Sequence, residues 1–297
     1  MARNAPTTDA DPRQILAEAG WPDPQDIVQI EGGWDTVIWR FQTPDGKRHG
    51  LRLYRPRDGT HESARRELLA ISAMRSAGLA APEVEATGQH GDLPYFVMTW
   101  LPGIPIVTIL EKKLWRLFSL AHEFGRLQAR YHRLAPRELA WEDSAWCDLE
   151  AYPELSAAVR ADCRDDALCH FDYHPLNVLA DSSGITGVLD FSFSGLADRR
   201  ADLGRTQAIL TAAPIPPSPV RPLLQLVRKQ FAVHWRRGYL AEAGDFPLEP
   251  LYEAWGGATF VRDIEDAVAD GRGWGTPADI QRIKAYVADR MRAAGLA

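Results

Sequence analysis

The sequence predicts an α+β protein with two lobes, a small β-rich lobe over residues 1–102 and a larger, mainly helical lobe over residues 103–297. Three observations favour this division. The first hundred residues read mostly as strands and turns around one helical segment. A short connector, Thr99 to Gly103, follows them. After it the hydrophobic pattern becomes mainly helical, with one hairpin and one proline-rich stretch as exceptions.

The elements of the first lobe follow from local signals. Val37, Trp39 and Phe41 alternate in a β-rich run, as they would on one face of a strand. Thr43-Pro44-Asp45-Gly46 has the composition of a turn, because Pro presets φ and Gly accepts positive φ. The pattern then predicts a returning strand, an amphipathic helix and two further strands, over residues 48–54, 61–77, 84–87 and 94–99.

The second lobe is expected to consist mainly of helices. Residues 111–134 have a broad apolar face that includes Leu114 and Phe118, which predicts one long core helix. Residues 177–191 turn strand-like again, with Asp181-Ser182-Ser183-Gly184 as the tip of a hairpin. From residue 202 onward the pattern is helical, except for a proline-rich connector over residues 214–222.

Composition excludes several classes of protein. The 34 Lys and Arg against 40 Asp and Glu give a net charge of -6, so no nucleic-acid partner is expected. The sequence has no apolar run of about 20 residues that could span a membrane, and its start lacks a signal core, which predicts a cytoplasmic protein. Its three cysteines show no paired spacing, so neither a disulfide framework nor a zinc knuckle is expected.

The densest polar cluster of the sequence contains an H-x-D-x-x-x-x-N pattern that begins at His170. A strand-like run then ends at Asp190, thirteen residues after Asn177. Phosphoryl transfer needs a carboxylate that orients an attacking hydroxyl, and oxygen ligands that hold Mg²⁺ on the nucleotide phosphates. The ordered set of Asp172, Asn177 and Asp190 can supply one base and two metal ligands, and it therefore predicts phosphotransferase chemistry.

On these residues the sequence resembles the aminoglycoside phosphotransferase and choline kinase-like small-molecule kinases, which share the protein-kinase-like fold. The resemblance extends from about residue 27 to about residue 264 and is best over residues 168–203. It implies a phosphotransferase that uses ATP and Mg²⁺ and acts on a hydroxyl of a small molecule. Asp172 would be the catalytic base, and Asn177 and Asp190 the magnesium ligands.

The same resemblance implies supporting roles around this loop. His170 would brace the catalytic loop, and Asp202 would be structural rather than catalytic. Phe171 is a departure, because glycine is common at that position in the family. We expect this departure to affect the packing of the loop rather than the identity of the base.

The resemblance also places nucleotide-binding residues in the first lobe, namely Gly32, Gly33, Arg52, Glu67, Met98 and Trp100. The two glycines resemble the loop that covers the phosphates, since glycine lets the backbone approach phosphate closely. Met98 and Trp100 lie in the segment that resembles the hinge. Arg52 stands where the family more commonly has lysine, and it keeps the charge but not the geometry. Glu67 would be its acidic partner.

Two other interpretations are left open. A pseudokinase that binds nucleotide without turnover is favoured mildly by the missing lysine, although the base and both metal ligands are present. His170, Asp172 and His174 alternate in a way that also suits a metal hydrolase. A zinc site there needs further ligands, and the remaining histidines have no supporting spacing.

The acceptor is expected to be a small molecule that carries a hydroxyl group. Three acidic segments, residues 141–150, 162–166 and 263–266, suit a cationic acceptor, so an aminoglycoside or another amino sugar is the first candidate. Macrolide, amino alcohol and homoserine acceptors stay open. The choice between ATP and GTP, the oligomeric state and any role in antibiotic resistance are not determined by the sequence.

Overall fold

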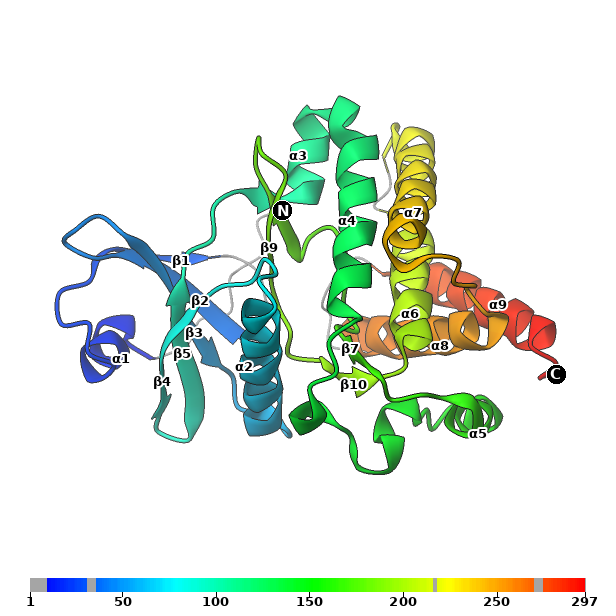
Figure 1. Cartoon of the computed structure of the whole chain (residues 1–297), viewed down its shortest axis with the longest axis horizontal. Coiled ribbons are helices and arrows are strands. Elements are labelled where there is room, and N and C mark those ends of the chain that lie inside the picture. Colours follow the sequence, from blue (N-terminus) through cyan, green and yellow to red (C-terminus); the bar gives the residue numbers. More distant parts are fainter. Residues whose placement is uncertain (1–9, 31–35, 216–217, 270–274, 297) are drawn as a thin grey trace.

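The computed structural model describes residues 10–30, 36–215, 218–269 and 275–296. A twisted β-sheet lies on one side of the molecule and a group of helices on the other, as Figure 1 shows. This is the α+β arrangement that the sequence predicts. The short helix α1 (Pro12–Glu18) buries Ile15 and Leu16 in the same apolar cluster as Phe41 of the sheet.

The sheet has five antiparallel strands in the order β1-β2-β3-β5-β4. In that order their bounds are Gln25–Ile30, Thr36–Gln42, Arg48–Tyr54, Leu93–Thr99 and Val84–His90. The hairpin predicted from the turn at residues 43–46 is confirmed, because Trp39 on β2 lies opposite Leu51 on β3. Helix α2 (Thr60–Ser76) follows β3 and contacts β5, within one residue of the predicted helix.

Helices dominate the chain after the connector. They are α3 (Ile106–Lys112), α4 (Leu117–Tyr131), α5 (Pro153–Asp162), α6 (Arg199–Ala212), α7 (Arg221–Ala243), α8 (Pro250–Ala269) and α9 (Pro277–Ala293). Helices α4 and α7 approach closely at two glycines. A Cβ on Gly125 would lie 2.0 Å from the Trp235 carbonyl oxygen, and one on Gly238 would lie 1.9 Å from the His122 carbonyl oxygen. Side chains at these positions would force the two helices apart.

Two small sheets are inserted among these helices and carry the polar loops. Strands β6 (Ile104–Pro105), β8 (Val178–Ala180) and β9 (Ile185–Val188) form one of them. The pairing of β8 with β9 confirms the hairpin predicted around residues 181–184. Strands β7 (Ala167–Cys169) and β10 (Gly195–Ala197) form the other.

The prediction of one helix over residues 111–134 is wrong. Helix α3 ends at Lys112, Lys113 adopts φ −135° and ψ 61°, and a short 3-10 turn precedes α4. The apolar face therefore begins only at Leu117. Leu114 and Phe118, assigned to the core from the sequence, are 42% and 52% exposed. The pattern failed because it joined apolar residues from both sides of a break in the backbone.

The largest apolar cluster crosses the connector between the sheet and the helices. It includes Phe96 and Met98 from the sheet side together with Phe124 and Trp235 from the helices. A boundary between two lobes at residues 102 and 103 stays a prediction. In this cluster, apolar residues that precede the predicted boundary pack against apolar residues that follow it.

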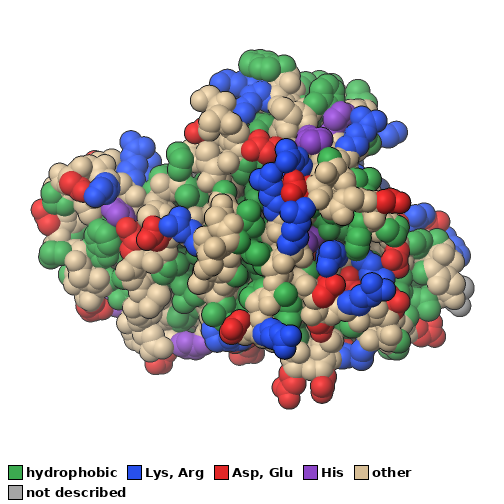
Figure 2. All heavy atoms as spheres, in the orientation of Figure 1, with side chains coloured by type: hydrophobic (Ala, Val, Ile, Leu, Met, Phe, Trp, Pro, Cys, Tyr) green, Lys and Arg blue, Asp and Glu red, His purple; other side chains and the backbone are tan. Residues whose placement is uncertain are grey.

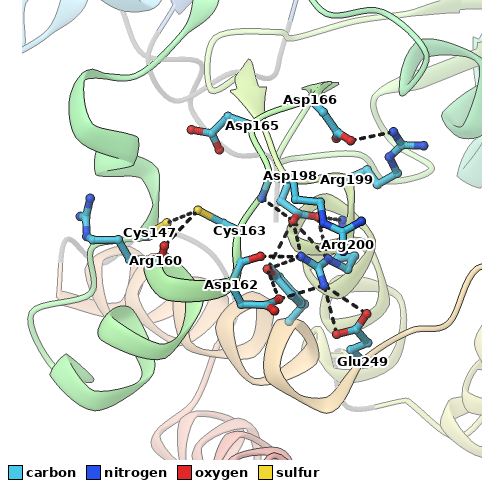
Figure 3. A network of polar contacts seen from close by, with 12 residues as sticks. Cys147, Arg160, Asp162, Cys163, Asp165, Asp166, Asp198, Arg199, Arg200 and Glu249 are labelled. Atoms are coloured by element: carbon cyan, nitrogen blue, oxygen red, sulfur yellow. Dashed lines mark hydrogen bonds and ion pairs between the residues drawn. The ribbon is translucent and has the colours of Figure 1, made fainter.

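A buried arginine ties three helices of the second half together. The Arg200 guanidinium contacts the carboxylates of Asp162, Asp198 and Glu249, and Figure 3 shows these groups converging on it. In the same view Cys147 and Cys163 lie with their Sγ atoms 3.9 Å apart, and all three cysteines are free thiols. Desolvation raises the pKa of the Cys147 thiol.

Charged side chains gather over helix α4. Figure 2 shows Lys and Arg side chains gathered along α4, where Arg126, Arg130 and Arg133 surround Glu242 at 3.1 to 3.4 Å. No helix within the described residues combines the length and the apolar character that a membrane crossing requires.

Candidate active site

The loop between β7 and β8 holds Asp172 and Asn177 together. The Asn177 side-chain amide donates hydrogen bonds to Asp172 Oδ2 and to the Asp172 carbonyl oxygen, both at 3.0 Å. His174 Nε2 lies 3.3 Å from the same Asp172 oxygen. The two predicted residues therefore form one contact unit, and Oδ1 of Asp172 receives no hydrogen bond from the described residues.

Phe171, the residue before Asp172, has a left-handed backbone with φ 60°. This region is unfavourable for a bulky residue and easy for glycine, which agrees with the glycine that is common at this position in the family. Two buried side chains hold the strained peptide in place. Phe171 N–H donates to Asp202 Oδ1 at 2.6 Å, and Arg205 Nε donates to the Phe171 carbonyl oxygen. The ring is buried against Trp146 and Trp255.

His170 connects the loop that holds Asp172 to the end of strand β9. Its Nε2 hydrogen bonds to the Leu189 carbonyl oxygen at 3.0 Å, and its Nδ1 accepts from the Asp172 backbone N–H at 3.2 Å. Desolvation lowers the pKa of His170, which favours the neutral ring that these two bonds require. Because both ring nitrogens are engaged, neither is left to bind zinc. The described ranges also contain no group of three or more His, Cys, Asp or Glu residues placed to hold a metal.

Asp190, just after β9, is joined directly to the sheet by Arg52, and through Arg52 to helix α2. Asp190 also has positive φ, at 63°, in a region that Asp tolerates better than most residues. Its Oδ1 lies 2.7 Å from Arg52 Nη2 and accepts the Ser192 hydroxyl at 2.8 Å. Arg52 Nη1 lies 3.1 Å from Glu67 Oε1, so one buried guanidinium joins both carboxylates. The contact of Arg52 with Glu67 that the resemblance implies is present in the structure.

The electrostatics of the site favour the ionised forms of Asp172 and Asp190. Burial acts to raise the pKa of Asp172, but the neighbouring His174, Arg205 and His170 outweigh it and hold that pKa well below its usual range. Burial likewise opposes ionisation of Asp190, and the Arg52 guanidinium still keeps its pKa lowered. Burial raises the pKa of Glu67 to about 7 despite Arg52.

The remaining predicted residues lie away from this contact network or outside the described ranges. Met98 is buried at the end of β5, and Trp100 is half-buried in the connector, with Arg40 6.0 Å from its ring centroid. Gly50 packs against both, since a Cβ there would lie 3.3 Å from Met98 Cε and 3.5 Å from Trp100. Gly32 and Gly33 fall in residues 31–35, outside the part of the chain that the structure describes.

Sequence reasoning missed Arg205 as part of the site. Its guanidinium binds the Phe171 carbonyl oxygen and pairs with Asp263 of α8. A signal was available, because Arg205 follows Asp202 by three residues on a helix, and residues three apart share a face. Nothing in the sequence indicates that Asp263, which belongs to one of the three acidic segments, pairs with this arginine.

The comparison with family models decides the assignment. A model described as a phosphotransferase enzyme family matches residues 26–241. The chain belongs to this family. The predicted family and enzyme class, a small-molecule kinase with an alcohol group as acceptor, are thereby confirmed. No curated protein matches the sequence of this phosphotransferase.

Solved structures share the fold of this phosphotransferase. A thermostable mutant of the aminoglycoside phosphotransferase APH(4)-Ia, in its apo form, is similar with a TM-score of 0.61 and 17% identity, over 95% of this chain and 99% of that one. Macrolide 2'-phosphotransferase MphH from Brachybacterium faecium gives 0.52 and 21%, over 93% and 97%. The amicoumacin kinase hAmiN, in complex with AMP-PNP, Ca²⁺ and Ami, gives 0.60 and 14%, over 95% and 94%. The predicted kinase-like fold is confirmed.

Proposed function

We propose that this phosphotransferase transfers the γ-phosphoryl group of ATP to a hydroxyl of a small molecule in a Mg²⁺-dependent reaction. The observation that carries the proposal is the pairing of Asp172 with Asn177 next to Asp190, whose carboxylate is joined through Arg52 to Glu67. This arrangement offers a base, two oxygen ligands and a fixed cation, which are the parts that phosphoryl transfer requires.

Asp172 is proposed to orient the acceptor hydroxyl and to receive its proton. Its lowered pKa keeps it ionised at neutral pH, so it is ready to accept a hydrogen bond. Asn177 and His174 fix Oδ2, which leaves Oδ1 for the hydroxyl. A base with so low a pKa contributes mainly by holding the hydroxyl in line for attack, and proton transfer follows as the new P–O bond forms.

The donor set at Asn177 and Asp190 fits Mg²⁺. Since the Asn177 side-chain nitrogen donates to Asp172, its oxygen is left to act as a ligand. Asp190 Oδ1 is engaged by Arg52 and Ser192, whereas Oδ2 has no partner among the described residues. Carboxylate and amide oxygens are the ligands that Mg²⁺ prefers. When bound, the ion would neutralise charge on the phosphates.

We propose that the nucleotide binds to residues of the first predicted lobe, 1–102, on the side that faces the second predicted lobe, 103–297. Arg52 would steady the phosphates with help from Gly32 and Gly33, and Met98 and Trp100 would bound the adenine site. The AMP-PNP bound to the amicoumacin kinase supports ATP as the donor. The burial of Arg52 between Glu67 and Asp190 supports its substitution for the usual lysine, because its position is fixed from both sides.

The acceptor class is proposed only as a small molecule with a hydroxyl. A mutant of the aminoglycoside phosphotransferase APH(4)-Ia has been solved in a ternary complex with AMP-PNP and hygromycin B, which supports an aminoglycoside as a candidate acceptor. An aminoglycoside or another amino sugar stays a prediction for this chain. Much of the acidic charge behind that prediction is paired within the protein. Asp166 pairs with Arg199, Asp263 with Arg205 and Glu265 with Lys284.

The test is a phosphorylation screen with ATP, Mg²⁺ and a panel of amino sugars, macrolides and amino alcohols. We expect ATP consumption with at least one acceptor, and Asp172→Ala should lower that rate by about 10²–10⁴-fold. The matched control is Asp92→Ala, which removes an exposed carboxylate from the turn between β4 and β5 and should leave the rate unchanged. Nucleotide binding without turnover on any acceptor would favour the pseudokinase interpretation, and full activity of Asp172→Ala would exclude Asp172 as the base.

A further inference from the structure

A cationic pocket opens on the helical side of the molecule, separate from the contacts of Asp172. It has a volume of about 820 Å³ and lies between α6, α7 and α9. Six of its lining side chains are cationic, and they are Arg221, Arg228, Lys229, Arg236, Arg237 and Arg282. The other described lining residues are apolar or neutral, among them Leu210 and Val233, and no carboxylate is present among them.

Most of these cations have no carboxylate within ion-pair distance among the described residues. Of the six, only Arg282 has an ion pair with a carboxylate of the described residues, Asp279, at 2.8 Å. Arg228 donates instead to the carbonyl oxygens at the end of α6, including that of Ala213 at 2.6 Å. The guanidinium nitrogens Arg221 Nε and Arg236 Nη1 are buried without a hydrogen-bond partner in the described ranges.

The buried arginines of the chain are paired differently from these half-buried or exposed cations. Arg52 and Arg200 each contact two or more carboxylates. The whole chain has a net charge of -6, so carboxylates are not scarce. Burial lowers the pKa of Arg228 to about 10, and the nearby charge of Arg282 adds to that effect. Arg228 and Arg282 therefore repel each other across the pocket, and an anion bound between the lining cations would relieve that repulsion.

We propose that this pocket binds an amphipathic organic anion, with its apolar part against Leu210 and Val233 and its acidic group among the cations of α7. The volume falls within the range of about 300–1,000 Å³ that is common for small-molecule sites. The ligand class follows from the lining: apolar side chains favour a hydrocarbon or aromatic body, and uncompensated arginines favour carboxylate, sulfonate or phosphate.

Helix α6 contributes residues both to this pocket and to the contacts with the loop that holds Asp172, but the two sets of residues differ. Asp202 and Arg205 contact Phe171, whereas Gln207, Leu210 and Thr211 line the pocket. The inference therefore does not depend on the proposed phosphoryl transfer. Loss of the cationic residues should leave ATP binding unchanged while it removes anion binding.

The experiment is a fluorescence titration of the full chain with 8-anilinonaphthalene-1-sulfonate, an aromatic sulfonate, beside the uncharged N-phenyl-1-naphthylamine. We expect saturable binding of the sulfonate that weakens as salt rises, and much weaker binding of the uncharged compound. The double variant Arg221→Gln/Lys229→Gln should weaken sulfonate binding by about tenfold or more. The matched control, Lys112→Gln/Lys113→Gln at the end of α3, removes two exposed cations outside the pocket and should bind as the unmodified protein does.

Thermal unfolding of each variant checks that the fold is retained, since the probe also binds loosely packed states. Equal binding of the charged and uncharged probes would overturn the proposal, because it would show that the apolar surface alone is recognised. Equal sulfonate binding by the folded double variant and the control would overturn it as well, because the probe would then bind elsewhere.

Discussion

Asp190 follows strand β9 and Asp202 lies on helix α6, and the two carboxylates differ in how many hydrogen-bond partners the protein gives them. Asp202 is fully buried and accepts hydrogen bonds from Gln128, Tyr131 and His132 on one oxygen and from the Phe171 amide on the other. The side chain of Asp190 is 30% exposed, and only one of its oxygens has partners among the described residues.

The difference indicates a division of labour. A buried carboxylate whose two oxygens both accept hydrogen bonds from the protein can stabilise a loop but has no free oxygen for a ligand. A carboxylate that is held through one of its oxygens keeps the other oxygen for a metal ion or substrate. We infer that Asp202 fixes the shape of the loop that holds Asp172. Asp190 is held through one oxygen and keeps the other for a ligand.

The largest expected effect is the loss of stability on Asp202→Asn. An amide has one oxygen and a donor group in place of the second acceptor, so it leaves either the Phe171 amide or the donors from α4 without an acceptor. We expect the free energy of unfolding to fall by about 3–5 kcal/mol, the typical loss when one partner of a buried pair is removed. Urea unfolding measures it, with Asp92→Asn as an exposed control that should unfold as the unmodified protein does.

Arg52→Gln separates the stabilising from the functional part of the Asp190 network. It leaves Glu67 and Asp190 without their shared cation, so we expect a loss of about 3 kcal/mol in unfolding free energy together with at least about tenfold weaker ATP binding. The double variant Arg52→Gln/Glu67→Gln removes one unpaired carboxylate and should recover part of the stability. Titration calorimetry should show that ATP affinity stays weak in both variants. Recovery of affinity in the double variant would contradict a direct role of Arg52.

The smallest effect is on the pH dependence of stability. Burial acts to raise the pKa of Asp202, but His132 and Gln128 overcome it and lower that pKa to about 2, from an ordinary value of 3.8. Because the folded pKa lies below the unfolded one, the ionised carboxylate contributes stability above about pH 4, and this contribution is lost as the pH falls through 2. The stability gap between the unmodified protein and Asp202→Asn should therefore be constant from pH 7 to 5 and should narrow toward pH 2. Urea unfolding from pH 7 to pH 2 measures this gap. A gap that stayed constant down to pH 2 would contradict the lowered pKa of Asp202.

The sequence predicted the parts of the fold and site that depend on local order. The hairpin after Thr43 and the spacing of Asp172, Asn177 and Asp190 are local patterns. The structure contains that hairpin and a contact between Asp172 and Asn177, and the backbone N–H of Leu189, next to Asp190, donates to the Asn177 carbonyl oxygen. The break at Lys113 was missed because an apolar face looks the same on either side of it.

Pairing over long sequence distances was harder to predict. The ion pair of Arg205 with Asp263 depends on how helices α6 and α8 pack against each other, which hydrophobic periodicity does not determine. The same holds for the gathering of cations around the pocket between α6, α7 and α9. The link between Arg52 and Glu67 was predicted only through the family resemblance. Residue spacing alone would have left both as ordinary members of a strand and a helix.

The most direct test of this division compares Asp190→Asn with Asp202→Asn in two measurements on the same samples, thermal unfolding and Mg²⁺-dependent binding of a non-hydrolysable ATP analogue. The account predicts that Asp190→Asn keeps most of the unfolding temperature but loses the effect of Mg²⁺ on ATP binding. It predicts that Asp202→Asn unfolds at a clearly lower temperature yet, at a temperature where it is folded, still binds ATP more tightly when Mg²⁺ is added. The reverse pattern, with Mg²⁺ dependence intact in Asp190→Asn and lost in folded Asp202→Asn, would contradict the account.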